Sequence, residues 1–427
     1  MTTRSRIDRR TFVVLLLAGC ADTSRHPPVV LPQTPGPASV PPATLPLPTS
    51  GNESFDVWLR SYRAKALAEG IPASVLDREL SSLTPNPRVA SLDTKQPEFS
   101  KPVSDYIKGV ISDARVAQGR QFHDELSYLP ALEQRYGVPR EIVLAVWAME
   151  SAFGKIQGDM DVLRSLATLA WEGRRREWAE GELSAALRII ARGEAERSRL
   201  KGSWAGAMGQ TQFMPSVYLT TAVDGDGDGR RNIWGSTQDA LASTANYLAK
   251  AGWVRGQGWA REVILPAGFD LSITEGPKNP VSAWEAQGVR RADGRPWPAA
   301  ELAAPAQLLL PSGAGGPAFL ALPNHFAIRR YNNSMSYALG IGLLADQFAG
   351  GGPLVTPWPY EPALSMEDRL LAQRALAKLG FDPGPADGVI GSNTRAQLRL
   401  WQKSLGLPAD GYLTLSNIRR LAAEAAL

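Results

Sequence analysis

The chain is poor in the side chains on which many enzymes depend. Its 427 residues include a single cysteine, Cys20, and three histidines that lie far apart, His26, His123 and His325. One cysteine excludes an internal disulfide. The scattered histidines argue against a histidine-rich metal site and against a Ser/His/Asp triad. If the protein is an enzyme, carboxylates are the groups left to carry its chemistry.

The N-terminal apolar run is too short to remain in a membrane as a spanning helix. Phe12–Ala18 follows Arg9-Arg10 and leads into Leu17-Ala18-Gly19-Cys20. Basic residues, an apolar run and small residues before a cut are typical of a secretory signal. Leu-Ala-Gly-Cys resembles the bacterial lipobox, and the arginine pair before Thr-Phe resembles a twin-arginine export signal. We therefore expect residues 1–20 to be a lipoprotein signal peptide with Cys20 lipidated. The alternative is a plain signal peptide with a coincidental cysteine.

Neither sign of charge is in large excess. The net charge is +4, with 44% hydrophobic and 21% charged residues, which is ordinary for soluble globular proteins. This slight positive balance does not distinguish nucleic acid, membrane and wall polymer as partners. The length indicates two or three domains, because one hydrophobic core rarely grows past roughly 250–300 residues.

The chain divides by composition into a tether and two folded parts. Residues 21–52 are rich in Pro, Thr, Ser and Ala, which predicts an extended tether. Residues 53–350 show mainly helical patterns. Within them, residues 255–321 are rich in Gly, Pro and Trp, which predicts loops with short strands at Val263–Leu265 and Gln307–Leu310. The helical runs are Phe55–Glu69, Ser104–Tyr136, Pro139–Phe153, Trp178–Gly193, Ser236–Ala251 and Ser336–Phe348.

A small module follows a Gly- and Pro-rich linker and covers residues 364–427. Helices are expected at Met366–Leu379, Asn393–Leu405 and Leu415–Ala425. Between them Pro-Ala-Asp-Gly occurs twice, at 385–388 and 408–411, and Asp-Gly pairs favour tight turns. The pattern predicts three short helices joined by two similar turns.

Glu150 is the carboxylate in the most unusual position. It follows eight consecutive apolar residues, 142–149, which predict a helix buried on all sides. Burial would raise the pKa of this carboxyl group, as a general acid near neutral pH requires. The alternative is a glutamate in the last helical turn that points into solvent.

Two further stretches suit a carbohydrate ligand. The Gly-rich segment 202–216 combines the polar side chains of Ser203, Gln210 and Gln212 with aromatic rings, and residues 329–337 place Tyr331 and Tyr337 on either side of two asparagines. Sugars need hydrogen bonds to their hydroxyl and amide groups and flat apolar surfaces for their C–H faces. Alone, the first stretch is also explained by a packing loop, and the second by a capped helix start.

Taken together and in this order, these stretches resemble the membrane-bound lytic murein transglycosylase B family over residues 53–350. The resemblance rests on Met149-Glu150-Ser151-Ala152-Phe153-Gly154, Leu166–Ala170, Ala205–Gly209, Gln212–Ser216, Ala245–Leu248 and Arg330-Tyr331-Asn332 with Ser334. The C-terminal module resembles the peptidoglycan-binding domain type 1, through Leu379–Asp382, Asp387–Gly391, Thr394-Arg395 and Trp401-Gln402.

The resemblance implies a mainly α, lysozyme-like catalytic core with a small mixed loop/strand insertion, and a C-terminal three-helix peptidoglycan-binding module. It implies cleavage of the MurNAc-GlcNAc β-1,4 bond of peptidoglycan with 1,6-anhydromuramyl ends, Glu150 being acid and then base. No cofactor is required for this reaction. The residues that fall where the family lines its sugar groove are Ser203, Gln212, Phe213, Tyr247, Tyr331, Asn332 and Tyr337.

The acidic segment Asp224-Gly225-Asp226-Gly227-Asp228-Gly229 matches the start of an EF-hand calcium loop. Its twelfth position is Gly235 in place of the bidentate glutamate, while Asp239 could close a larger loop. We expect structural Ca²⁺ on Asp224, Asp226, Asp228 and Asp239, or else a metal-free Asx-turn loop.

Two other functions stay open at this point. A hydrolytic muramidase would need a second carboxylate, for which Asp159, Asp161 and Glu172 are the nearest downstream candidates. A wall-binding lipoprotein would bind glycan without cleaving it. We expect an exported monomer on the periplasmic face, attached to the outer membrane through Cys20, with peptidoglycan and not nucleic acid as its partner.

Overall fold

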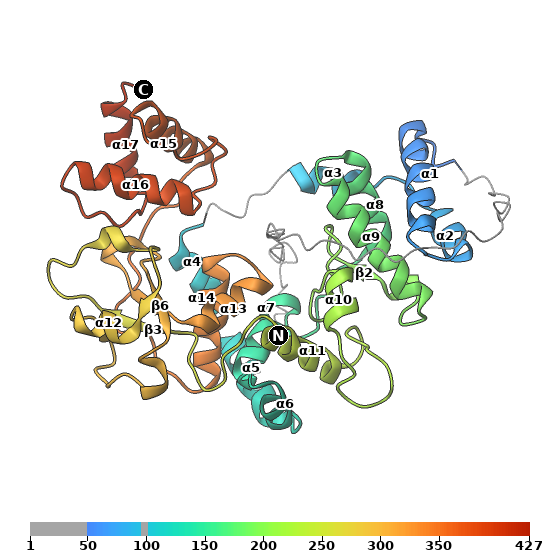
Figure 1. Cartoon of the computed structure of the whole chain (residues 1–427), viewed down its shortest axis with the longest axis horizontal. Coiled ribbons are helices and arrows are strands. Elements are labelled where there is room, and N and C mark those ends of the chain that lie inside the picture. Colours follow the sequence, from blue (N-terminus) through green and yellow to red (C-terminus); the bar gives the residue numbers. More distant parts are fainter. Residues whose placement is uncertain (1–48, 95–100) are drawn as a thin grey trace, which may run out of the picture.

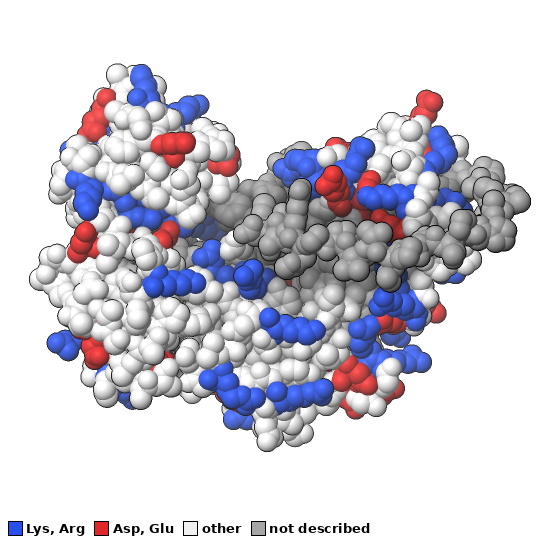
Figure 2. All heavy atoms as spheres, in the orientation of Figure 1, with Lys and Arg blue, Asp and Glu red and all other residues white. Residues whose placement is uncertain are grey.

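The computed structural model describes residues 49–94 and 101–427, so Cys20, the expected signal peptide and nearly all of the expected tether lie outside the described residues. In these ranges the chain is mainly helical and carries one five-stranded sheet (Figure 1). No helix in the described part is both long and apolar enough to span a membrane. On the described surface seen in Figure 2, basic side chains are spread among acidic ones.

A first group of helices surrounds its own apolar core. Phe55 and Leu59 are buried in this core together with Leu163 and Leu183, which are distant in sequence. The indole of Trp58 donates a hydrogen bond to Glu180 across the contact, at 3.0 Å. The helices of this group are α1 (Glu53–Ala68), α2 (Ala73–Leu80), α3 (Pro87–Thr94), α8 (Val162–Glu172), α9 (Arg176–Ala191) and α10 (Pro215–Thr221).

A second group is built around one central helix, α7. Residues 142–148 of this helix are all buried, which confirms the prediction of a helix apolar on all sides. Helices α14, α5, α11 and α6 pack against it. The members of this group are α4 (Val103–Val110), α5 (Asp113–Glu125), α6 (Leu129–Tyr136), α7 (Arg140–Ser151), α11 (Thr237–Lys250), α13 (Pro323–Tyr331) and α14 (Met335–Phe348).

The run Ser104–Tyr136, predicted as one helical stretch, is three helices. Helix α4 ends before Ile111, and the Ser112 hydroxyl accepts a hydrogen bond from the Arg115 N–H to begin α5. Helix α6 then begins afresh with Pro130 in its first turn. The prediction was wrong about continuity because apolar periodicity can persist across a break, whereas caps and prolines set where helices begin and end.

The segment 255–321 forms an antiparallel sheet with strand order β4-β6-β7-β3-β5. The predicted strands are present, in slightly shifted positions, as β3 and β6. Leu308 of β6 pairs with Leu320 of β7, and Trp284 of the short helix α12 packs beneath. The elements are β3 (Ala260–Ile264), β4 (Asn279–Pro280), α12 (Val281–Ala286), β5 (Arg290–Arg291), β6 (Pro305–Leu309) and β7 (Ala318–Ala321).

The C-terminal module has the three predicted helices, α15 (Met366–Lys378), α16 (Ser392–Ser404) and α17 (Leu415–Glu424). Each Asp-Gly turn is held in the same way. The side-chain oxygen of Gln373 accepts from the Gly388 N–H, and that of Gln402 accepts from the Gly411 N–H, both at 2.8 Å. Both glycines have φ near +70°, which L side chains rarely adopt, so the repeated Pro-Ala-Asp-Gly is a repeated structure.

The module rests on the sheet region (Figure 1). Glu275 accepts two hydrogen bonds from the Arg395 guanidinium, at 2.8 and 3.1 Å, and its side chain is only 11% exposed. The Asp410 carboxylate accepts from the Ala314 N–H at 2.9 Å. These polar contacts fix the module on the sheet region.

Candidate active site

Glu150 lies in the last turn of α7 and is 3% exposed. The chain then turns sharply, because Ala152, Phe153 and Gly154 all have positive φ, at 49°, 59° and 78°. Two of these residues carry side chains that disfavour this conformation, and such strain is typical of functional sites. The prediction of a buried carboxylate is confirmed, and the solvent-facing alternative is wrong.

The hydroxyl of Tyr337, in α14, donates a hydrogen bond to the Oε1 atom of Glu150 at 2.5 Å. Burial raises the pKa of Glu150 to about 8, and the hydrogen bond from Tyr337 lowers it by a smaller amount. Glu150 is therefore mainly protonated near neutral pH. Burial and this hydrogen bond are the two causes of the shift, so no described carboxylate acts on the charge of Glu150 as a close second acid would.

The Gly-rich segment forms the support behind the turn that follows Glu150. The Ser151 hydroxyl donates to the Gln210 main-chain oxygen at 2.7 Å, and the Trp147 indole donates to the Gln210 side-chain oxygen at 2.9 Å. Gln212 has φ of +50°, and its side-chain amide donates to the main-chain oxygens of Gln157 and Gly209. Gln210 thus holds helix α7 against this segment, and Gln212 holds the loop that follows the helix.

Three aromatic rings from separate elements meet beside this support. The ring centroids of Phe213 and Tyr247 are 5.7 Å apart, those of Phe213 and Tyr331 are 5.8 Å apart, and those of Tyr247 and Tyr331 are 4.8 Å apart. The Tyr331 hydroxyl donates to the Thr211 main-chain oxygen at 2.5 Å. Helices α11 and α13 are therefore joined to the Gly-rich segment at the site.

Residues 54–346 match the model of the transglycosylase SLT domain family, which is more than half of the chain. The chain belongs to the transglycosylase SLT family. Residues 365–421 match the model of a peptidoglycan binding domain. Both resemblances seen in the sequence are thereby confirmed, and so is the fold class.

Several known proteins are similar to this chain over long stretches. Membrane-bound lytic murein transglycosylase B of Escherichia coli (strain K12) is 36% identical over 249 residues, which are 57% of this chain and 66% of that protein, just under two thirds of its length. SltB3 from Pseudomonas aeruginosa, solved in complex with NAG-anhNAM-pentapeptide, is 48% identical, with a TM-score of 0.82 over 87% of this chain and 100% of that one. Slt35 from Escherichia coli, solved in complex with calcium, is 33% identical, with a TM-score of 0.59 over 68% and 92% of the chains.

Two of the expected groove residues, Gln212 and Phe213, pack against other protein groups, and their contact with substrate stays a prediction. The amide group of Gln212 already donates to two main-chain oxygens, and Phe213 is 2% exposed beneath the two tyrosines. Both residues therefore stabilise the Gly-rich segment in the described structure. The sequence missed the roles of Trp147 and Ser151, because their partner Gln210 lies about sixty residues further along the chain.

The other expected groove residues stay predictions as substrate contacts, and the structure gives their positions. Tyr331 and Tyr247 lie together, and Tyr337 touches Glu150. Asn332 is buried, at 2% exposure, directly after α13. The Ser203 hydroxyl accepts from the N–H groups of Ala205 and Ala207 and shapes the Gly-rich turn.

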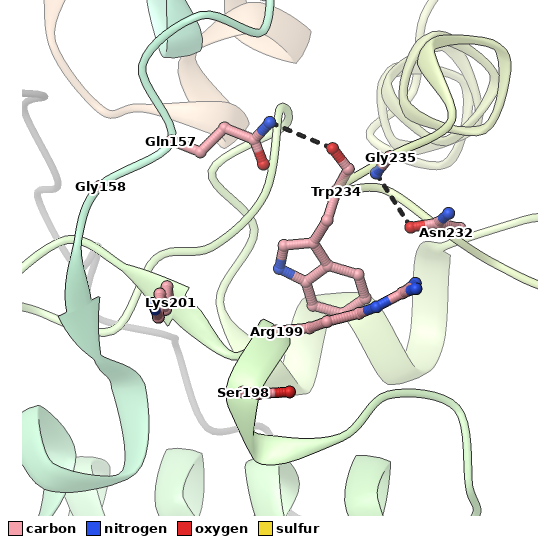
Figure 3. Close-up of a pocket in the computed structure, with 8 residues that line it drawn as sticks. All are labelled: Gln157, Gly158, Ser198, Arg199, Lys201, Asn232, Trp234 and Gly235. Atoms are coloured by element: carbon pink, nitrogen blue, oxygen red, sulfur yellow. Dashed lines mark hydrogen bonds between the residues drawn. The ribbon is translucent and has the colours of Figure 1, made fainter.

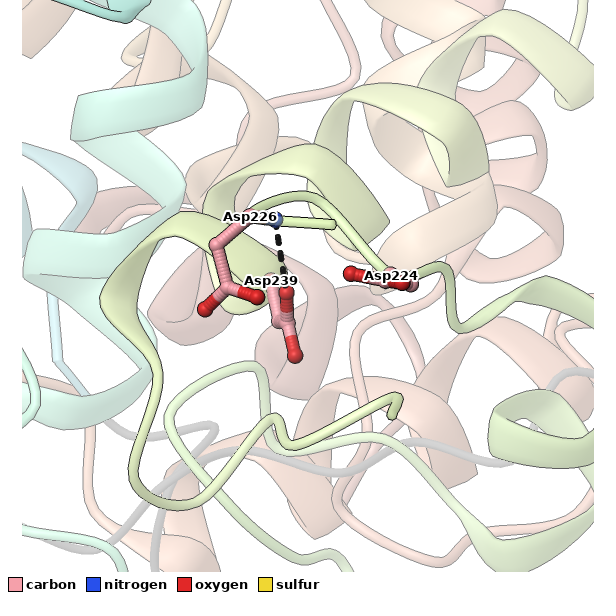
Figure 4. Close-up of side chains that lie close together, drawn as sticks. All are labelled: Asp224, Asp226 and Asp239. Atoms are coloured by element: carbon pink, nitrogen blue, oxygen red, sulfur yellow. Dashed lines mark hydrogen bonds between the residues drawn. The ribbon is translucent and has the colours of Figure 1, made fainter. Parts of the chain in front are cut away.

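The expected metal ligands come together only in part (Figure 4). Carboxylate oxygens of Asp224, Asp226 and Asp239 lie within 4.8 Å of one another. Asp228 does not belong to this group in the described structure, where its carboxylate accepts a hydrogen bond from the Arg230 N–H, and its role as a ligand stays a prediction. In a loop of alternating Asp and Gly, the side chain of this third aspartate turns back onto its own backbone.

Proposed function

We propose that the protein is a lytic transglycosylase that cleaves the MurNAc-GlcNAc β-1,4 bond of peptidoglycan and leaves 1,6-anhydromuramyl ends. The observation that carries this proposal is Glu150, a buried and protonated carboxyl group on a central helix, hydrogen-bonded to Tyr337. Family membership and the SltB3 complex with an anhydromuramyl ligand support the reaction and its product.

The reaction uses one protein carboxyl group twice. Glu150 donates its proton to the oxygen of the scissile bond, and that bond breaks. The N-acetyl group of the muramyl sugar stabilises the positive charge on its C1 atom. Glu150, now a carboxylate, takes the proton from the C6 hydroxyl, whose oxygen bonds to C1 and closes the anhydro ring. No water is consumed, and Glu150 ends protonated as it began.

The structure favours this chemistry over hydrolysis by a muramidase. Glu172 and Asp159 are exposed. Asp161 is the N-cap of α8 and forms an ion pair with Arg197 at 2.8 Å. None of the three sets the pKa of Glu150, so none stands out as the second carboxylate that a hydrolase needs.

The decisive experiment treats purified sacculi with the protein and analyses the products by mass. We expect anhydromuramyl products from the wild type and none from Glu150→Gln, because the amide is nearly isosteric but cannot donate a proton. Glu141→Gln, on the same helix, is the matched control and should remain active. Reducing-end products from the wild type would show a muramidase, and substantial turnover by folded Glu150→Gln would refute the mechanism.

We also propose that the protein is exported, that lipidation of Cys20 holds it on the periplasmic face of the outer membrane, and that it works as a monomer. The support is the lipobox-like sequence at the end of the signal-like segment and the similarity to a relative described as membrane-bound. Cys20→Ala should move the protein from the membrane fraction to the soluble one. Unchanged partitioning would place the anchor elsewhere.

A structural calcium ion is the second proposal for this chain, at Asp224, Asp226 and Asp239. The hydrogen-bond partners of these carboxylates include main-chain N–H groups and the Ser236 hydroxyl, and no described ion pair neutralises them. Burial raises the pKa of Asp239, as expected for a carboxylate that lacks a countercharge. Clustered oxygen ligands suit Ca²⁺. An ion there would stabilise the loop without taking part in proton transfer.

A further inference from the structure

A cavity of about 350 Å³ lies beside strand β2 (Lys201–Gly202), between the loop after Glu150 and the segment that leads into α11. Arg199 and Lys201 belong to one wall of the cavity, and Asn232 and Trp234 belong to the opposite wall (Figure 3). Gln157 comes from the loop that follows Glu150. This volume is within the range of small-ligand sites. None of these side chains takes part in the proposed proton transfers.

The cavity holds two positive charges without protein partners. In the described ranges neither Arg199 nor Lys201 forms an ion pair, and both side chains belong to exposed residues. Their neighbours differ, because Arg197 pairs with Asp161 and Arg231 pairs with Glu194. Two cations that line one cavity and have no ion-pair partner in the described ranges favour an anionic group on the ligand.

The remaining lining suits amide groups. Trp234 packs its ring on Tyr218, with centroids 5.3 Å apart, and its buried indole nitrogen has no hydrogen-bond partner in the described structure. The side chains of Gln157 and Asn232 lie on either side of this indole (Figure 3). An aromatic ring beside the side-chain amide of Asn232 suits a peptide segment, and the two cations suit its carboxylates.

The wall of the cavity is continuous with the active site. The Gln157 side-chain amide donates to the Gly154 and Trp234 main-chain oxygens, both at 3.1 Å, and its own main-chain oxygen accepts from Gln212. Gly158 packs so closely on β2 that an added Cβ would lie 2.2 Å from the Gly202 carbonyl. The loop that leaves Glu150 is thus also a wall of the cavity.

We propose that this cavity binds the carboxylate-bearing peptide stem of the substrate strand, through Arg199 and Lys201. The inference rests on the proposed function, since it assigns a further recognition site to the same substrate. A stem held there draws its strand toward the turn that positions Glu150. Glycan strands that carry stems are then bound more tightly than bare ones.

The test compares the double variant Arg199→Gln/Lys201→Gln with the wild type on two substrates, soluble strands that carry their stems and the same strands after amidase has removed the stems. We expect KM for stem-bearing strands to rise roughly fivefold to tenfold, as for the loss of two solvent-screened charge contacts. The value of kcat, and KM for bare strands, should not change. The control Arg60→Gln/Arg192→Gln removes the same net charge from two exposed arginines away from the cavity and should leave both KM values unchanged.

Equal KM values for variant and wild type, or an equal rise on both substrates, would overturn the proposal. The second result would show general attraction to the strand. A separate arm measures binding of the free tripeptide stem by calorimetry, with the wild type binding and the double variant not. This arm tests the cavity even if the wild type cleaves neither substrate, in which case the proposed function fails instead. Absence of binding to the wild type would count against the cavity alone.

Discussion

At the scale of single residues, the buried carboxyl group of Glu150 lowers the stability of the folded protein near neutral pH. Its pKa is raised from 4.5 to about 8 by burial. A carboxyl group with a higher pKa in the folded state binds its proton more tightly there than in the unfolded chain. The free energy of unfolding is therefore highest below the pKa that Glu150 has in the unfolded chain. It falls as the pH rises above that value and levels off above the pKa of the folded state.

Replacing this group should stabilise the protein. We expect Glu150→Gln to unfold at higher denaturant concentration than the wild type near pH 7, by no more than about 3 kcal/mol. The difference should vanish near pH 4, where the wild-type group is protonated in both states. Denaturant unfolding at both pH values measures it. A constant difference across this range would mean that a lost contact, and not proton linkage, sets the stability.

Tyr337 should set the pH limit of activity. Its hydrogen bond lowers the pKa of Glu150, so Tyr337→Phe should move the alkaline loss of activity to higher pH. The carboxylate formed in the first step also loses a donor, which should lower kcat roughly 10- to 100-fold. A pH–rate profile checks both effects. Tyr247→Phe, whose hydroxyl donates to the Arg330 main-chain oxygen, should leave the pH limit in place.

Sequence reasoning reached Glu150 for a physical reason, because an unbroken apolar run predicts burial and burial predicts a raised pKa. The contact between Tyr337 and Glu150 joins residues that are 187 positions apart. Local hydrophobic periodicity cannot predict a contact between residues so far apart in the sequence. The same holds for Ser151 with Gln210. The alternation of Asp and Gly indicates candidate ligands but not which carboxylates lie together, and the structure groups Asp224, Asp226 and Asp239 without Asp228.

At the scale of elements, the acidic loop and the start of α11 form one unit. The Asp239 carboxylate accepts from the N–H groups of Gly225 and Asn232, at 2.7 and 2.6 Å, and so ties both ends of the loop to the helix. Asn232 is also a wall residue of the cavity beside β2. The acidic loop is therefore connected, through Asn232, to the cavity that lies beside the loop after Glu150.

Calcium should raise the melting temperature through this unit. An ion that binds only the folded loop stabilises it by mass action. The rise should be modest, because Gly235 replaces the bidentate ligand and affinity should resemble the millimolar extracellular loops. Thermal melting with chelator and with added calcium measures it, with Asp226→Asn reducing the response and Asp228→Asn leaving it intact. No shift up to several millimolar would favour the metal-free turn, and loss of all cleavage in chelator would show a catalytic need for the ion.

The element boundaries show where local patterns stop being informative. The sequence predicted only a few short strands in the segment 255–321. Strands as short as β4 and β5, with two residues each, leave no recognisable alternation in the sequence. Pairing of residues far apart in sequence makes the sheet five-stranded. In contrast, the three helices of the C-terminal module were predicted well, because Asp-Gly turns and caps mark their ends locally.

At the scale of the whole molecule, Glu275 joins the two functional parts. It is nearly buried between the sheet and Arg395, with Arg399 4.0 Å away. Removal of this carboxylate leaves two arginines without their countercharge, which costs more than loss of an exposed pair. The docking of the module therefore depends on this residue.

Glu275→Ala should loosen the module without disturbing Glu150. We expect weaker binding to intact sacculi, because a second site adds avidity only when its position matches the first. Activity on short soluble strands should be unchanged. Glu285→Ala, an exposed glutamate of α12, is the control, and a chain that ends at residue 363 gives the lower limit for sacculus binding. Binding equal to the wild type in the Glu275 variant would mean that the linker alone positions the module.

The docking of the module has a consequence for the orientation in which a glycan strand binds. A glycan strand has two chemically different ends, so it can be laid across a protein in two opposite ways. A freely tethered module could grip the strand either way, whereas one fixed by Glu275 meets it in a single orientation relative to Glu150. A strand bound at both places would therefore be held in one polarity by the module as well as by the active site.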